Sequence, residues 1–214
     1  MRMLDFFKKK MSVRDAAITM ALFTWNTDES ATLDMISTAS TNTAVIRREL
    51  ILMRLYVGLL VLQNKAGNDR DLVTHQALEY NIATTVLFRH QHRKELLDNP
   101  VLADIIKYVR GVIEGQLASM SHTHPANARN IESKRDLFRQ MDASAVDVRL
   151  GAYEHAFASG YGNIMEGLQS VTHEFARAVS GSRSIELEMA AFIAVGAQWK
   201  FGNEMFDNVK LVHN

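Results

Sequence analysis

The chain of 214 residues contains no cysteine and only two prolines. Without cysteine it can form no disulfide, no thiolate-ligated zinc site and no iron–sulfur cluster, and a thiolate nucleophile is excluded. This composition suits a reducing compartment, and we expect a cytoplasmic protein. Because proline interrupts helices, its scarcity favours an all-α fold, as do 11 methionines and many alanines and leucines.

A net charge is also lacking, because 24 Lys and Arg residues balance 24 Asp and Glu residues. A neutral chain has no overall field to attract a polyanion, so nucleic-acid binding would need a local basic patch. The best candidate is Arg89–Lys94, but this cluster has no interleaved aromatic residues and no helix-turn-helix pattern beside it. We therefore expect no nucleic-acid partner.

Short catalytic motifs are missing as well. The sequence contains no P-loop, no G-x-G-x-x-G after a strand, no G-x-S-x-G and no H-E-x-x-H. No glutamate is followed by a histidine three residues later, which the di-metal carboxylate sites of helical bundles require. These absences lower the expectation of an enzyme. A pocket built from scattered residues on several helices would leave no such motif.

The strongest positive feature is the apolar stretch Arg47–Gln63. Between Leu50 and Leu62, only Arg54 and Gly58 interrupt a run of Leu, Ile, Met, Tyr and Val. A helix that is apolar on every side is enclosed by other helices, and this run is shorter than the about 20 residues needed to cross a bilayer. We therefore predict an all-α, bundle-like single domain of about seven or eight helices around a buried central helix at about 44–64.

Turn and capping residues predict where other elements begin and end. Asn99–Pro100 is the sharpest helix start, because asparagine caps and proline fits the first helical turn. Ser119–Ile131 is rich in turn residues, with His122-Thr123-His124-Pro125 in its middle, so we place a loop or hinge at about 119–132. We find no strand-like alternation of adequate length.

Small residues recur at intervals of four at Ala152, Ala156 and Gly160. This spacing places them on one helix face. Small side chains leave room for a neighbouring backbone, so we predict a close helix–helix approach there. The glycines that follow, in Gly160–Asn163, predict an interruption of the helix.

Residues 1–10 form a basic and aromatic N-terminal segment ahead of a single helical domain at 11–214. Phe6, Phe7 and the basic cluster Lys8–Lys10 are typical of a segment that contacts an anionic membrane. One short cluster anchors a protein weakly, so we favour the alternative in which the segment packs onto the domain.

One polar stripe offers weak candidates for metal ligands. Asp71, His75 and Glu79 fall at intervals of four and stack on one helix face. An imidazole with carboxylates can bind a divalent ion if another helix supplies further ligands. We favour the alternative of a solvated face, because no partner ligand set is evident. His122 and His124 alone are too few for a stable zinc site, so we predict no metal and no cofactor.

The final helix is the clearest sign of association. Between Glu188 and Lys200 every residue is apolar or small except Gln198, and large side chains are interleaved with Ala and Gly. A helix this apolar must be covered, either by the rest of the chain or by a second copy. The interface candidates are Ile185, Met189, Phe192, Ile193 and Trp199.

These observations lead to two functional hypotheses. The first is a soluble, non-enzymatic interaction or regulatory protein that forms a homodimer, or binds another protein, through apolar helix faces. The second is a helical enzyme or small-ligand-binding protein, metal-dependent or not, with a pocket between helices and Asp71, His75 and Glu79 as its polar groups. An exposed apolar patch would support the first, and a deep pocket with inward-facing His or carboxylates the second. The sequence indicates no catalytic residue.

Overall fold

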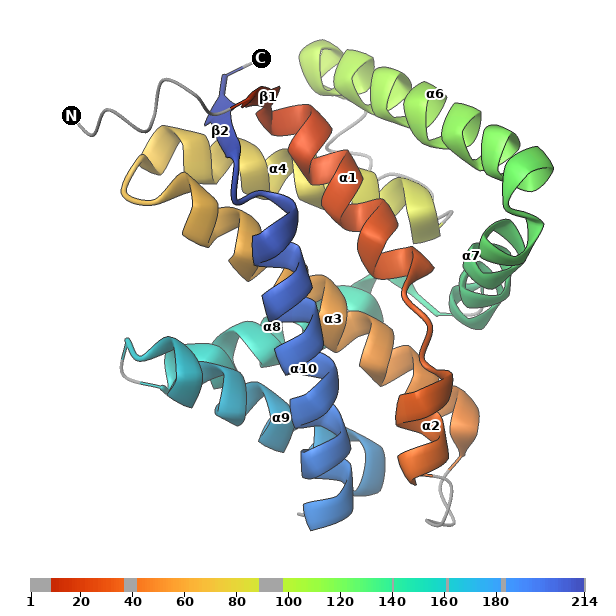
Figure 1. Cartoon of the computed structure of the whole chain (residues 1–214), viewed down its shortest axis with the longest axis vertical. Helices are drawn as coiled ribbons and strands as arrows, with labels where there is room; N and C mark the ends of the chain where they lie inside the picture. The colour runs from red at the N-terminus through yellow and green to blue at the C-terminus, as the bar shows by residue number, and fades with distance from the viewer. Residues whose placement is uncertain are drawn as a thin grey trace. The chain divides into compact units, whose positions relative to one another are not determined.

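The computed structural model describes residues 9–36, 42–88, 98–139, 141–160, 162–181 and 184–213. Within these ranges the chain forms nine α-helices and one two-stranded parallel sheet (Figure 1), which confirms the all-α prediction. The helices are α1 (Val13–Asn26), α2 (Ser30–Ile36), α3 (Thr43–Ala66), α4 (Arg70–Phe88), α6 (Pro100–Thr123), α7 (Pro125–Phe138), α8 (Ala143–Ala158), α9 (Ile164–Ser180) and α10 (Ile185–Met205), and the strands are β1 (Lys9–Ser12) and β2 (Val209–Val212).

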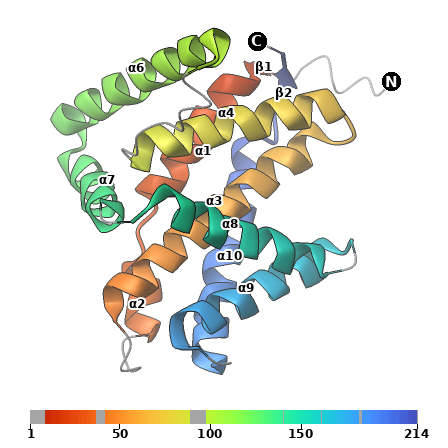
Figure 2. The same cartoon turned by 180° about the vertical axis from the view of Figure 1, so that it is seen from behind.

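The chain divides into two compact units. The first unit comprises the described parts of Met1–Asn26, Gly58–Arg139 and Phe201–Asn214, and the second comprises those of Thr27–Val57 and Gln140–Lys200. Helices α3 and α10 therefore each contribute one segment to each unit. Within the second unit, α8 and α9 lie side by side (Figure 2).

Helix α3 is the buried central helix predicted at about 44–64. It starts where expected, because the Asn42 side chain accepts a hydrogen bond from the backbone N–H of Ala44 at 3.0 Å. Every residue of Leu50–Val57 and of Leu60–Leu62 is buried. Gly67, with φ of 64°, then takes the left-handed conformation that ends many helices.

The buried Arg54 of α3 is paired within the second unit. Its Nη1 lies 3.4 Å from Glu29 Oε1, and Arg47 Nη2 lies 3.9 Å from Glu29 Oε2. Burial lowers the pKa of Arg54, and the charges of Glu29 and Asp28 oppose that shift. The one cation inside the apolar run is thus tolerated because a carboxylate is buried beside it.

Aromatic side chains from α1, α4 and α7 meet in the first unit. The ring of Trp25 lies 4.9 Å from that of Phe88 and 5.6 Å from that of Phe138, both edge to face. Two fully buried cationic side chains of α7 also bind the C-terminal ends of α1 and α4. Lys134 Nζ donates to Trp25 O at 2.7 Å, and Arg135 Nε donates to a carbonyl in the last described turn of α4 at 2.8 Å. A cation there complements the negative end of the helix dipole.

The loop predicted at about 119–132 is wrong in its extent. Helix α6 continues to Thr123 and α7 begins at Pro125, so only His124 lies between them. The hydroxyls of Ser121 and Thr123 each donate to the carbonyl four residues earlier, at 2.9 and 3.0 Å. With these bonds made, Ser121 and Thr123 are accommodated in the helix, although the turn-rich composition of this segment predicts a loop. A hinge at this position stays a prediction.

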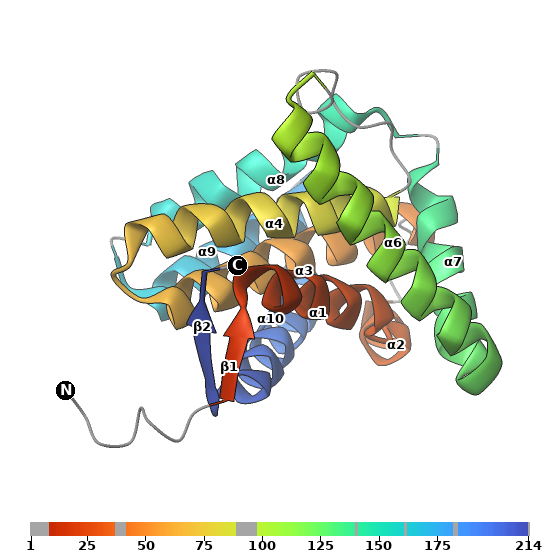
Figure 3. The ribbon, with the colours of Figure 1, turned by 90° about the horizontal axis from the view of Figure 1, so that it is seen from above.

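Two short strands, which no alternation in the sequence indicates, accompany the helices. Strands β1 and β2 pair in parallel with Lys9 opposite Val209 and Ser12 opposite Val212, which joins two distant parts of the chain (Figure 3). Each strand has four residues, too few for an alternating pattern to be recognised. The segment predicted at 1–10 is described only from Lys9, and the basic cluster Arg89–Lys94 lies outside the described residues.

Gln76 of α4 is fully buried, and neither atom of its amide has a hydrogen-bond partner within the described ranges. An unsatisfied buried polar group costs about 1–3 kcal/mol, so Gln76→Met should raise the free energy of unfolding by about that amount. Urea denaturation would measure the change. Gln116→Met, at an exposed position of α6, should stay within about 0.5 kcal/mol of the native chain. An equal effect of the two substitutions would contradict the prediction.

Candidate interaction surface

The outer side of α10 is apolar and exposed. Ile185 is 74% exposed, Met189 57%, Phe192 45% and Ile193 49%. These residues recur at i, i+4, i+7 and i+8, which places them on one side of the helix. Trp199 falls on the same side and is half-buried. We call these five interface candidates the α10 face. Large contiguous patches of exposed apolar side chains are typical of interaction sites.

The opposite side of α10 is covered. Its side chains are mostly small, and Leu187, Ala190, Ala191, Ala194 and Val195 are all at most 2% exposed. The helix therefore already uses one apolar side for the core of the chain. The α10 face is a second apolar side, and it is in contact with solvent.

Helix α10 contacts α9 near its first turn. Gly181, with φ of 72°, ends α9, and the Ser184 hydroxyl accepts a bond from the N–H of Leu187 at 3.4 Å. His173 Nε2 of α9 lies 3.2 Å from Glu188 Oε2 of α10. These contacts hold the start of α10 against its neighbour and leave its outer side unobstructed.

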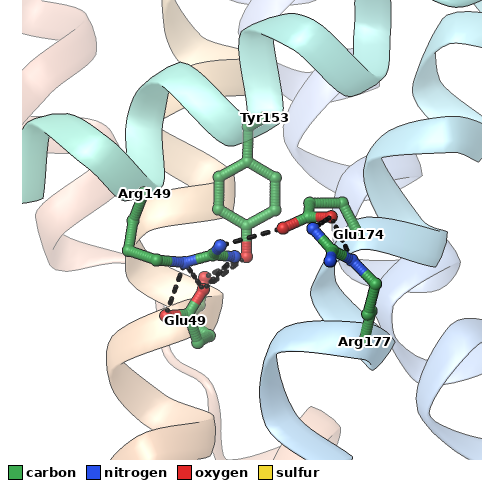
Figure 4. Close-up of polar contacts among 5 residues, drawn as sticks. All are labelled: Glu49, Arg149, Tyr153, Glu174 and Arg177. Carbon is green, nitrogen blue, oxygen red and sulfur yellow. Dashed lines mark hydrogen bonds and ion pairs between the residues drawn. The ribbon is translucent and has the colours of Figure 1, made fainter. Parts of the chain in front are cut away.

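In the same unit, a mostly buried polar network joins α3 to α8 (Figure 4). Arg149 Nε donates to both carboxylate oxygens of Glu49 at 3.1 Å, and its Nη2 donates to Glu49 Oε2 at 3.0 Å. The hydroxyl of Tyr153, one turn along α8, donates to the same Oε2 at 2.7 Å. Glu49 is therefore held by a forked guanidinium and a phenol.

The same arginine extends the network to α9. Arg149 Nη1 donates to Glu174 Oε1 at 2.8 Å, and Arg177 donates to Glu174 Oε2 through Nε at 2.8 Å (Figure 4). Two carboxylates are thus matched by two guanidinium groups. Arg149 bridges both carboxylates, and three helices are fixed through it.

The surroundings of Tyr153 and Arg149 shift their pKa values so that both side chains keep their protons. Burial, together with the charge of Glu49, raises the pKa of Tyr153 well above its ordinary value, so the phenol stays protonated and donates. Burial alone would lower the pKa of Arg149, but its hydrogen bonds to Glu49 and Glu174 reverse the shift and raise it. Since each carboxylate is engaged by arginine, the arrangement suits a structural role better than proton transfer.

The three weak metal candidates do not form a ligand set. Asp71 and His75 are exposed, whereas Glu79 is buried and binds Arg14, with Arg14 Nη2 2.9 Å from Glu79 Oε1. Burial raises the pKa of Glu79, and the ion pair with Arg14 opposes that shift. The ring of His75 lies 5.5 Å from that of His213. Within the described residues, no group of three or more His, Asp or Glu side chains could hold a metal ion.

No family model matches the chain, and neither a curated protein nor a solved structure is significantly similar to it. No helix in the described ranges is both long enough and apolar enough to span a membrane.

Proposed function

We propose that this chain is a helical interaction protein that self-associates through the α10 face. The observation that carries the proposal is the row of four large apolar side chains, each about half exposed or more, on the outer side of α10. Fully burying one such side chain stabilises by about 1.5–3 kcal/mol, so covering the row would contribute several kcal/mol towards association.

A second copy of the chain is the partner we infer. Most soluble oligomers are homo-oligomers with two-fold symmetry, in which the same patch of both subunits is buried at once. Small interfaces are typical of weak and transient complexes, and a single helix face offers little area, so we expect a dissociation constant in the micromolar range. A cytoplasmic location stays a prediction from the cysteine-free composition.

The alternative hypothesis of an enzyme or small-ligand-binding protein has less support. Its nominated polar groups were Asp71, His75 and Glu79, and Glu79 is occupied by Arg14 while the other two face solvent. We therefore put forward no second function.

The test is a charged substitution in the middle of the α10 face. In Ile193→Asp, association would bury an unpaired carboxylate, so we expect the dissociation constant to rise at least tenfold, which corresponds to about 1.4 kcal/mol. Light scattering and sedimentation over a series of protein concentrations would measure it. The matched control is Val148→Asp on α8, because Val148 is 70% exposed and lies in the same unit.

The control should leave association unchanged. A native chain that stays monomeric at hundreds of micromolar would refute self-association. Equal weakening by Ile193→Asp and Val148→Asp would refute the assignment of the interface to α10.

A further inference from the structure

Charge is distributed unevenly along α10. Glu186 and Glu188 lie in its first turn, and Lys200 lies at the last position of the helix within the second unit. Residues 189–199 between them contain no charged side chain. The part of α10 in the second unit therefore has two acidic residues at one end, an uncharged middle and Lys200 at the other end, and Glu204 follows one turn later in the first unit.

This distribution distinguishes two ways of pairing the faces of two copies. In a parallel pair, the acidic ends would lie side by side and so would the lysines. In an antiparallel pair, each acidic end lies beside the partner's Lys200. The two helix dipoles also point in opposite directions, which is the favourable arrangement for neighbouring dipoles. Like-charge contacts disfavour a wrong arrangement more strongly than opposite charges favour a correct one.

We infer that two copies pack their α10 faces antiparallel about a two-fold axis near Ile193. The inference rests on the proposed function. Ile193 lies midway between Glu186 and Lys200, so an axis there aligns the opposite charges of the two copies. At such an axis, each Ile193 lies against its own equivalent, as in any isologous interface.

Gly196 leaves room for a close contact at this register. A Cβ added at Gly196 would meet nothing within 4 Å, so the packing of the chain itself does not require glycine. The helical glycines Gly111, Gly115 and Gly151 have the same open space, so this space alone does not distinguish Gly196. In the antiparallel pair, Gly196 lies next to the turn that carries the partner's Met189, and the missing side chain leaves room for it.

Single-cysteine cross-linking tests the arrangement directly, because the native chain contains no cysteine. In the antiparallel pair, Ile193→Cys places two thiols beside the axis. Ile185→Cys places its thiols eight residues from the axis on each side, about 24 Å apart at 1.5 Å per residue. A disulfide needs Cα atoms within about 7 Å. We therefore expect efficient cross-linking at position 193 and less than a tenth as much at position 185.

Mild oxidation followed by non-reducing electrophoresis measures the covalent dimer, at a concentration where light scattering gives a dimeric mass. Val148→Cys sets the level of collisional cross-linking. Equal cross-linking at positions 193 and 185 would show a parallel pair and overturn the inference. A dimeric mass without cross-linking at position 193 would overturn it too. A monomeric mass would instead refute the proposed function.

Charge exchange provides a second readout. Glu186→Lys should raise the dissociation constant about three- to tenfold, because two rim contacts per dimer turn repulsive. Adding Lys200→Glu to that variant should restore the native value. A double variant no tighter than the single one would contradict antiparallel pairing.

Discussion

Arg149→Met is expected to lower the free energy of unfolding by about 3–5 kcal/mol, because it removes the cation from a buried carboxylate. The Glu49 side chain is only 10% exposed, and Arg149 supplies all of its ion pairing among the described residues. Without this guanidinium, only the Tyr153 hydroxyl would stabilise the charge of Glu49. Methionine preserves most of the side-chain volume, so the cost would reflect charge rather than a cavity.

Two further substitutions in the same network provide graded controls. Arg177→Met removes the other guanidinium, but Arg177 is 69% exposed, and an exposed ion pair contributes about 0–1 kcal/mol. Tyr153→Phe removes one hydrogen bond to a charged group and should cost about 1.5–3 kcal/mol. Urea denaturation followed by circular dichroism would rank the three. If Arg149→Met cost no more than Arg177→Met, the network would not stabilise the second unit as described.

Replacing both Glu49 and Arg149 tests whether the cost of Arg149→Met comes from leaving the Glu49 carboxylate buried without a cation. In Glu49→Leu with Arg149→Met, no carboxylate of α3 is left buried without a cation, so stability should recover towards the native value. Glu174 would still be paired with Arg177 in this double variant. A double variant less stable than Arg149→Met alone would contradict this account.

The central helix could be predicted from the sequence because burial on every side is recorded in local composition. The long apolar run in α3, interrupted only at Arg54 and Gly58, can be recognised without knowledge of its neighbours, and the observed bounds, Thr43–Ala66, differ little from the predicted 44–64. Capping residues were similarly informative. The Asn99 side chain accepts from the N–H of Val101 at 3.0 Å and Pro100 opens α6, as the pair predicts.

Contacts between distant residues could not be predicted in this way. Glu49 and Arg149 are 100 positions apart, and nothing in either segment indicates the other. The local signs of the network were the i,i+4 spacing of Arg149 and Tyr153 and the i,i+3 spacing of Glu174 and Arg177. The strand pairing of Lys9 with Val209 is equally non-local.

The α10 helix lies between these two cases. Its composition predicts that much of its surface must be covered, but an all-round apolar helix does not reveal which side faces its own chain. The structure buries Ala190 and Ala194 and exposes Met189 and Phe192. The alanines thus make the inner contact together with Leu187 and Val195, and most of the largest side chains form the outer face.

Gly160→Ala is expected to destabilise the second unit by about 3 kcal/mol, at the upper end of the range for overpacked sites. The predicted close approach near Gly160 is observed. A Cβ at Gly160 would lie 2.6 Å from the Cα of Gly167 and closer still to its nitrogen. Because these are backbone atoms at the start of α9, no side-chain rotation can relieve the clash, and α8 and α9 would have to separate.

Gly151→Ala is the matched control, since Gly151 lies in α8 itself and a Cβ there would meet nothing within 4 Å. Alanine is favoured over glycine in a helix by about 0.5–1 kcal/mol, so this substitution should stabilise the protein. The two variants make the same chemical change in or beside one helix, and denaturation should give shifts of opposite sign. Shifts of the same sign would mean that the backbones of Gly160 and Gly167 are not in contact.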